Sequence, residues 1–163
     1  MSEESAPASG RRPGPGVFIP PPLLFMVTVG AALGIHAKKP WPLPLPRNVE
    51  VVGGYVLLFG ALVLLFWGIK TFQSARTTIN PNRAADALVT NGPFTFSRNP
   101  LYVAMVVLCL GLALLIGTWW VVVLLPLPIL VVRLWVIASE EAHLRAEFGE
   151  DYEAYCRRVR RWI

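Results

Sequence analysis

The chain has 163 residues, of which 55% are apolar and 15% are charged, whereas a soluble domain carries roughly 25% charged residues. The apolar residues fall into four nearly uncharged blocks, each close to the roughly 20 residues that a helix needs to cross a bilayer. Composition therefore excludes a disordered protein and a soluble domain. It predicts an all-α integral membrane protein of about four transmembrane helices. The net charge of +5 is interpreted as favouring contact with anionic lipid headgroups and not with nucleic acid.

The N-terminal half is predicted to hold a tail, two spans and a connector. Residues 1–16 are polar and rich in Ser, Pro and Gly, which predicts a disordered tail, and residues 17–163 form a single membrane domain. The first span covers 17–37, and the second covers 51–70. Between them, residues 38–47 hold four alternating prolines, which predicts an extended connector at the headgroups.

The C-terminal half is predicted to hold a helical hairpin and two cap segments. The third span covers 100–118 and the fourth covers 119–137, where Pro126 and Pro128 interrupt it. Only Gly117 and Thr118 separate the two spans, so their other ends emerge on the same side. Residues 71–97 and 138–163 are expected to form a cytosolic cap at those ends.

The distribution of cations predicts the topology. Most of the Lys and Arg residues fall on the side of the two termini and the cap, and only Lys38, Lys39 and Arg47 fall on the other. Because cytoplasmic loops carry an excess of Lys and Arg, both termini and the cap are expected in the cytoplasm.

The chain has two cysteines and two histidines, the residue types that form disulfides and bind metals. Cys109 and Cys156 lie in unrelated settings, so no disulfide is expected. His143 among carboxylates predicts a surface histidine and no metal site. Gly149 is expected to stop one helix before a second, short helix, whose basic end is expected to lie on anionic lipid.

The first candidate site is the sequence 98-RNPLY-102 at the start of the third span. Asn is a preferred N-cap and Pro is favoured at the first helical position, so the helix is predicted to begin at Pro100 with Asn99 as its cap. A helix N-terminus offers free N–H groups, and Arg98 adds a planar cation, so together they suit a carboxylate or a phosphate. The alternative is that Asn99 only starts the helix while Arg98 reaches lipid phosphate.

The second candidate site is the acid pair Glu140 and Glu141, which follows the fourth span. Adjacent residues of a helix point about 100° apart, so one carboxylate is expected to turn inward while the other faces water. Arg133 lies seven residues before Glu140, on nearly the same stripe, which predicts that an inward Glu140 faces this arginine. The alternatives are a solvated edge of an amphipathic helix for the acids and a snorkelling side chain for Arg133.

The motifs of the C-terminal half occur in an order found in a known group of membrane enzymes. They are 88-LVTNGPF-94, 98-RNPLY-102, and the acid pair followed by Leu144, Phe148, Gly149, Tyr152, Tyr155 and Val159. This ordered set, which covers about 86–162, resembles the isoprenylcysteine carboxyl methyltransferase and phospholipid methyltransferase families.

The resemblance implies that S-adenosylmethionine binds in a cytosol-facing pocket, while a lipophilic substrate enters from the bilayer. The cofactor contacts that it implies are Asp86, Ala87, Leu88, Val89, Phe94, Asn99, Pro100, Leu101, Tyr102 and Glu140. Arg98, Glu140 and Glu141 are the candidate catalytic residues. Arg133 is the candidate substrate contact, because Val136 stands where the isoprenylcysteine enzymes place an arginine. The family often has Tyr at the position of Phe94 and His at that of Asn99.

The expected reaction is methyl transfer to an isoprenylcysteine-like carboxylate or to a lipid headgroup. For a carboxylate acceptor, Arg98 or Arg133 would orient it; for a lipid amine, a carboxylate such as Glu141 would help to remove a proton. A nicotinamide-dependent reductase of a sterol or polyprenol and a non-enzymatic membrane scaffold remain alternatives, although the chain offers no glycine-rich nucleotide fingerprint.

Overall fold

The computed structural model describes residues 20–74 and 88–163. In these two stretches every regular element is helical, which confirms the all-α prediction. The predicted tail 1–16 and the middle of the 71–97 cap segment lie outside the described residues. The elements are α1 (Pro21–Lys38), α2 (Arg47–Ser74), the 3-10 helix η1 (Gly92–Thr95), α3 (Pro100–Ile116), α4 (Trp119–Leu124), α5 (Pro126–Val131), the π-helix η2 (Val132–Ile137) and α6 (Ala138–Arg158).

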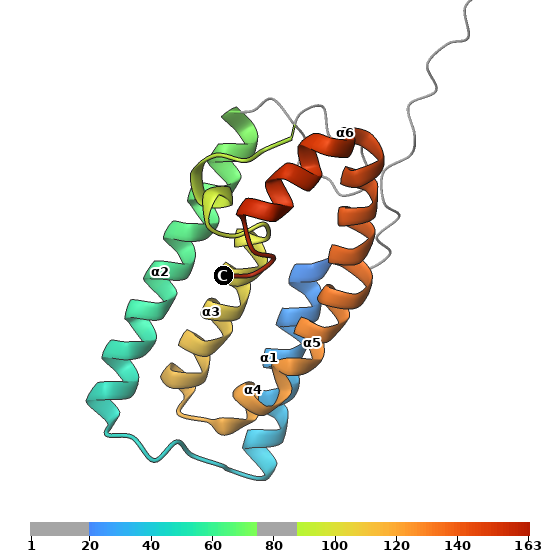
Figure 1. Cartoon of the computed structure of the whole chain (residues 1–163). Coiled ribbons are helices and arrows are strands. Elements are labelled where there is room, and N and C mark those ends of the chain that lie inside the picture. Colours follow the sequence, from blue (N-terminus) through green and yellow to red (C-terminus); the bar gives the residue numbers. More distant parts are fainter. Residues whose placement is uncertain (1–19, 75–87) are drawn as a thin grey trace, which may run out of the picture.

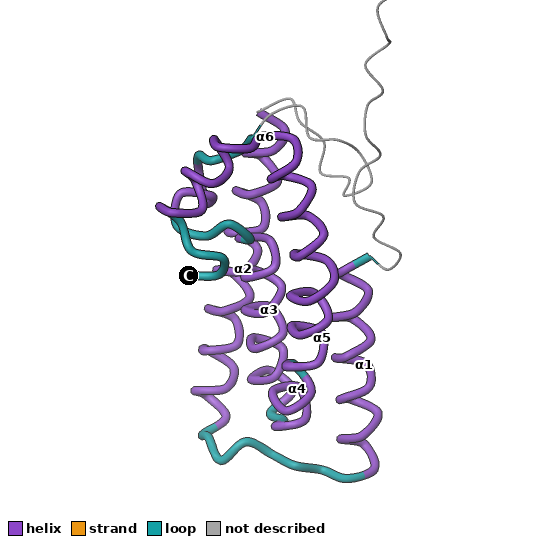
Figure 2. The backbone as a smooth tube through the Cα atoms, turned by 45° about the vertical axis from the view of Figure 1, so that its right-hand side comes forward, coloured by secondary structure: helices purple, strands orange, loops and turns teal. Residues whose placement is uncertain are grey.

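The helices form a bundle of two packed pairs with a cap at one end. α2 runs beside α3, while α4 and α5 pack on α1, and α6 bends over the end of the bundle near the start of α3 (Figure 1). The tube view shows the same arrangement from another side, with the 39–46 connector at the opposite end from α6 (Figure 2). The cap and the connector therefore lie at the two ends of the bundle.

Three helices are long and apolar enough to cross a membrane: Pro21–Lys38, Arg47–Ser74 and the continuous helix Trp119–Arg158. The helix at the third predicted span, Pro100–Ile116, is apolar but shorter, at 17 residues. Large apolar side chains such as Phe59, Phe66 and Trp135 are exposed on the outside of the bundle, as lipid contact requires. In Trp119–Arg158 the apolar segment ends at Ile137, and α6 beyond it is rich in charged residues.

The first two helices begin at other residues than predicted, and α2 also runs on to Ser74, beyond the predicted end at 70. α1 begins at Pro21 with prolines in its first turn, where missing N–H groups cost nothing. α2 begins at Arg47 rather than at 51, because Arg47 pairs with Glu50 one turn later and also donates to the carbonyl of Leu115 at 3.0 Å. This polar turn lengthens the second helix beyond its apolar segment.

Glycines allow α2 and α3 to approach closely. A Cβ added to Gly111 of α3 would lie 3.1 Å from the carbonyl oxygen of Gly54 and 3.1 Å from the backbone nitrogen of Leu58, both on α2. Small residues are the usual means by which membrane helices bring their backbones together. The α2–α3 pair is therefore the most tightly apposed part of the bundle.

The turn between α3 and α4 has the predicted tight geometry. Gly117 adopts a left-handed conformation with φ of 72°, and the Thr118 side chain caps α4 by accepting from the N–H of Trp120 at 3.2 Å. The connector is fastened to this turn: the N–H of Leu43 donates to the carbonyl of Gly117, and that of Trp119 to the carbonyl of Trp41. The connector thus fixes the hairpin at the end far from the cap.

The fourth span changes its helical pitch before it reaches the acids. Val132–Ile137 forms a π-helix between α5 and α6. A π-turn holds more residues than an α-turn, so it rotates the residues that follow it relative to those before it. For this reason Arg133 and Glu140 do not lie on one stripe, and the predicted alignment of these two residues is wrong.

α6 bends sharply at Gly149, where the backbone has φ of 48° and ψ of −120°. This confirms the predicted stop. The second half of α6 packs its aromatic face on the loop before α3, forming a separate cluster from the bundle core. The buried members of this cap cluster are Val89, Phe94, Tyr152, Tyr155 and Val159.

Candidate functional site

The first turn of α3 begins at Pro100, as predicted, but Asn99 does not cap it with its side chain. The Asn99 amide nitrogen Nδ2 instead donates to the carbonyl of Arg161 at 2.9 Å, and the backbone N–H of Asn99 donates to Ser97 Oγ at 3.1 Å. The N–H groups of Tyr102 and Val103 both donate to the carbonyl of Asn99. Asn99 therefore ties the start of α3 to the C-terminal segment instead of capping the helix, and the N–H of Tyr102 in the first turn is already engaged.

Tyr102 and Glu140 connect the two helix ends. The Tyr102 hydroxyl, on α3, donates to Glu140 Oε1, on α6, at 2.9 Å. Burial raises the pKa of the Glu140 carboxyl to about 7, and the hydrogen bond from Tyr102 opposes that rise. A carboxyl group with this pKa exchanges protons near neutral pH, which suits it to acid–base work.

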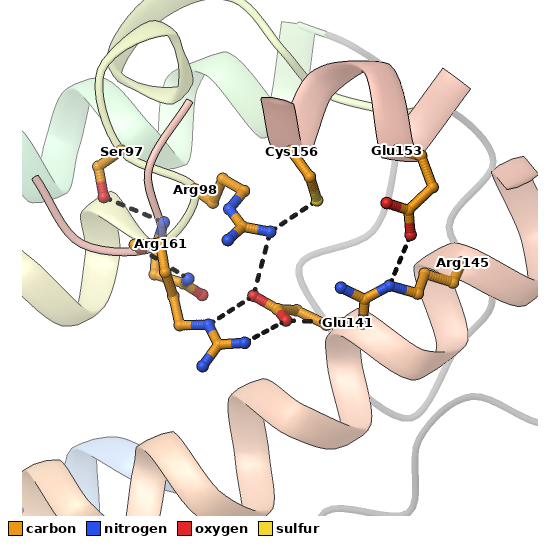
Figure 3. A network of polar contacts seen from close by, with 8 residues as sticks. Ser97, Arg98, Glu141, Arg145, Glu153, Cys156 and Arg161 are labelled. Carbon is orange, nitrogen blue, oxygen red and sulfur yellow. Dashed lines mark hydrogen bonds and ion pairs between the residues drawn. The ribbon is translucent and has the colours of Figure 1, made fainter. Parts of the chain in front are cut away.

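Glu141 is the more deeply buried acid, with 3% of its surface exposed, so the expectation that one of the two acids faces water is wrong. It lies among three arginines from three parts of the chain (Figure 3). Arg161 binds it with two charge-assisted hydrogen bonds, of 2.8 Å from Nε and 2.7 Å from Nη2, while Arg98 lies 3.4 Å and Arg145 lies 3.7 Å away. These ion pairs offset the cost of burying the carboxylate.

Arg98 reaches from the loop before α3 toward α6. Its Nη1 lies 2.6 Å from Cys156 Sγ as well as near Glu141, and its Nε is buried without a hydrogen-bond partner in the described residues (Figure 3). A buried donor without a partner is uncommon and costs free energy in the ligand-free protein. Within the described residues, Arg98 therefore has one buried N–H donor without an acceptor.

The structure brings together Arg98, Asn99, Tyr102, Glu140 and Glu141, so the predicted convergence of the two helix ends is confirmed. The other described residues that the resemblance implied as cofactor contacts lie in packed surroundings. Leu88, Val89 and Phe94 belong to the cap cluster, and the carbonyl of Phe94 accepts from the Tyr155 hydroxyl at 2.7 Å.

Two further implied contacts lie at the start of α3. Pro100 is buried, and Leu101 packs on Gly68 of α2. Asp86 and Ala87 lie outside the described residues.

Arg133 is exposed on the π-helix and makes no ion pair or hydrogen bond within the part of the chain that the structure describes. An arginine at this depth, outside the bundle, is placed to extend toward lipid phosphate. The snorkelling alternative for Arg133 thus fits the structure better than a place beside the acids.

Sequence reasoning missed Arg161, Arg145 and Ser97. The basic tail was expected to lie on lipid, yet Arg161 turns inward to Glu141. Arg145 was detectable, because it lies four residues after Glu141 on the same helix face. Arg161 carried no local signal, since its partner is 20 residues away and is reached only through the bend at Gly149.

Comparison with known proteins places these residues in a family. Residues 49–151, more than half of the chain, match the model of the phospholipid methyltransferase family. A protein-S-isoprenylcysteine O-methyltransferase of Schizosaccharomyces pombe is 35% identical over 92 residues, which is 56% of this chain and 39% of the yeast protein. An uncharacterised protein of Haemophilus influenzae is 33% identical over 66 residues, 39% of this chain and its own full length.

No solved structure matches the chain. The chain thus aligns with less than half the length of the yeast relative. The family match covers the α2–α3 pair, the hairpin and the first half of α6, and these are the elements that carry Arg98, Tyr102, Glu140 and Glu141. The chain belongs to the phospholipid methyltransferase family.

Proposed function

We propose that the protein is an S-adenosylmethionine-dependent methyltransferase that acts on a lipophilic acceptor at the cytosolic face of a membrane. The observation that carries the proposal is the joining of two helix ends, Tyr102 to Glu140 at 2.9 Å and Arg98 to Glu141 at 3.4 Å, at the polar end of an apolar bundle. Family membership and the resemblance of the motifs support the same chemistry.

The polar groups fit the amino-acid part of the cofactor, which carries an ammonium and a carboxylate. Glu140 accepts one hydrogen bond, from Tyr102, so its carboxylate has lone pairs left for an ammonium group. Arg98 has a buried Nε–H without a partner in the described residues, which suits a carboxylate. The two groups therefore offer complementary charges to the two ends of a zwitterion.

The bound cofactor would supply an electrophilic methyl group on a sulfonium sulfur. The chain's own part is to position an acceptor atom in line with that methyl group and to exclude water from the site. The apolar hairpin of α3 and α4 would hold the lipophilic part of the acceptor, and the ends of α3 and α6 would hold its polar head. The acceptor is proposed to be an isoprenylcysteine-like carboxylate or a lipid headgroup.

For an amine acceptor, Glu141 is a poor base for the proton. The Glu141 carboxylate is engaged by Arg98, Arg145 and Arg161, and such ion pairs make it a weak base. Glu140 has no arginine partner among the described residues and has a pKa of about 7 in the ligand-free protein, but it is assigned to the ammonium group of the cofactor. An amine acceptor would therefore react as the neutral amine, and the methylated ammonium product would carry the proton away. A carboxylate acceptor needs no base, and Arg98 would then orient it.

The direct test supplies the purified protein, in lipid nanodiscs, with isotopically labelled S-adenosylmethionine and a membrane lipid extract, and uses mass spectrometry to detect lipids that gain the label. We expect labelled products from the parent protein and a loss of roughly 100-fold in rate for Glu140→Gln, as for removal of an orienting group. Absence of S-adenosylmethionine binding by the parent, or binding of a nicotinamide cofactor instead, would contradict the proposal.

A further inference from the structure

The five residues after α6 form a segment that joins both halves of the proposed site. We call this segment, Val159–Ile163, the strap. Its carbonyl groups bind the start of α3: the N–H of Arg98 donates to Arg160 at 3.0 Å, and Asn99 Nδ2 donates to Arg161 at 2.9 Å. These two bonds hold the backbone of the strap against the end of α3.

The side chain of Arg161 reaches the other half of the site. Its guanidinium makes the bidentate contact with Glu141 of α6, at 2.8 Å and 2.7 Å. One residue therefore binds α3 through its backbone and α6 through its side chain, and Figure 3 shows Arg161 between the two. Because a planar guanidinium matches a carboxylate with two parallel hydrogen bonds, it fixes orientation as well as distance.

Neighbouring residues anchor the strap independently of this ion pair. Val159 is buried in the cap cluster, and Trp162 packs against the bundle core. Removal of the Arg161 side chain alone therefore leaves the backbone bonds and both apolar anchors in place. Beside these anchors, the ion pair links Glu141, and with it the first turn of α6, to the strap.

We propose that Arg161 is a positioning residue for the cofactor site: through its bidentate contact with Glu141 and its carbonyl contact with Asn99, it fixes the spacing between Arg98 and Glu140. The inference rests on the proposed function, because that spacing would match the two charged ends of the cofactor. Arg161 contacts Glu141 and makes no hydrogen bond to Tyr102 or Glu140.

The test compares Arg161→Gln and Arg161→Lys with the matched control Arg160→Gln. Arg160 is the adjacent strap residue, its side chain is exposed, and its substitution removes the same charge. Each full-length variant is measured in detergent for affinity to S-adenosylhomocysteine by calorimetry, for hydrogen exchange at residues 98–103 and 138–143, and for its melting temperature.

We expect Arg161→Gln to bind roughly tenfold more weakly, which corresponds to the loss of about one charge-assisted hydrogen bond, with faster exchange in both segments. Arg161→Lys should recover part of the affinity, because it keeps the charge but not the bidentate geometry. Arg160→Gln should resemble the parent. If Arg161→Gln does not fold, the comparison of Arg161→Lys with the parent tests the inference.

Three results would overturn the inference: unchanged affinity and exchange in Arg161→Gln, equal losses in Arg160→Gln, or a fall in affinity matched by a global fall in melting temperature in both Arg161 variants. Hydrogen exchange separates the two proposals. If the parent binds no S-adenosylhomocysteine while Arg161→Gln still loosens both segments selectively, the cofactor assignment fails and the link between α3 and α6 stands.

Discussion

At the scale of single residues, two adjacent acids have different surroundings. Glu141 is surrounded by guanidinium groups, whereas Glu140 has a phenol hydroxyl as its hydrogen-bond partner. The difference arises because adjacent positions on α6 point toward different neighbours: Glu141 toward the strap and Arg98, and Glu140 toward Tyr102. We therefore expect Glu141 to stabilise the fold and Glu140 to act in cofactor binding and catalysis.

The raised pKa of Glu140 predicts a pH-dependent stability. With an ordinary value of 4.5 and a folded value of about 7, the carboxyl group favours the folded state below pH 4.5, and this contribution is lost as the pH rises through 7. The loss amounts to about 3 kcal/mol, since one pKa unit is 1.36 kcal/mol. Glu140→Gln, which cannot ionise, should be the more stable protein at pH 8 and should match the parent near pH 4.5.

Melting temperatures in detergent from pH 4.5 to pH 8 measure this difference. Glu147→Gln is the matched control, because Glu147 is exposed on the same helix. Parallel profiles for the parent and Glu140→Gln would show that the carboxyl group is not buried as the structure has it.

Substitution of each acid should separate binding from folding. Glu140→Gln is expected to weaken S-adenosylhomocysteine binding more than tenfold while the cap stays folded, since no ion pair is lost. Glu141→Gln removes the common partner of three arginines and should lower stability by about 3 kcal/mol, as for breaking a buried ion pair. Calorimetric binding and thermal unfolding on the same samples decide between these effects, and the reverse ranking would contradict the assignment.

At the scale of the elements, the position of the site depends on how closely α2 and α3 pack. α3 carries Tyr102, and it lies against α2 at the Gly54–Gly111 contact. At the other end of the hairpin, the π-helix turns α6 so that its acids meet α3. Element packing thus aligns two residues that are 38 positions apart in the chain.

The close approach of α2 and α3 predicts that a single added methyl group between them lowers the stability of the bundle. In Gly111→Ala the new Cβ would meet the backbone of Gly54 and Leu58 at 3.1 Å, so the helices must separate, at a cost of about 1 to 3 kcal/mol. Gly60→Ala is the control, because a Cβ there meets nothing within 4 Å and alanine favours a helix. Thermal unfolding in detergent should show a loss for the first variant only; equal effects would exclude a tight contact.

At the scale of the whole molecule, the bundle has two chemically different ends. The cap end carries the acid pair and its arginines, whereas the other end carries the tryptophan-containing connector, with Trp41 and Trp120 in edge contact at 5.2 Å between ring centroids. Aromatic side chains favour the interface between headgroups and hydrocarbon. The proposed site therefore lies at the charged end of the bundle, opposite the aromatic connector.

The bias of cations predicts that the cap faces the cytoplasm. A cysteine placed at Leu45, exposed in the connector, should react with a membrane-impermeant maleimide on intact cells, whereas one placed at Glu147 should react only after lysis. Both variants are made with Cys156→Ser, and Cys109 is buried. Labelling in the reverse order would place the cap outside.

The sequence by itself determined the elements and the chemistry that they carry. Apolar block lengths, the Gly117–Thr118 turn, the helix start at Pro100 and the bend at Gly149 are set by bilayer thickness and by backbone conformations that local residues impose. Such effects act over a few residues, so they can be read directly from the chain.

Only the tertiary structure decided which groups meet. The π-turns that separate Arg133 from Glu140, the engagement of Asn99 by the strap, and the link from Arg161 to Glu141 each depend on how distant segments pack. The physical reason is that an arginine side chain can pair with lipid phosphate or with a buried carboxylate, and its neighbours in the sequence do not decide between the two. The choice follows from the path of the backbone, which places Arg161 within hydrogen-bond reach of Glu141 and leaves Arg133 on the outside of the bundle.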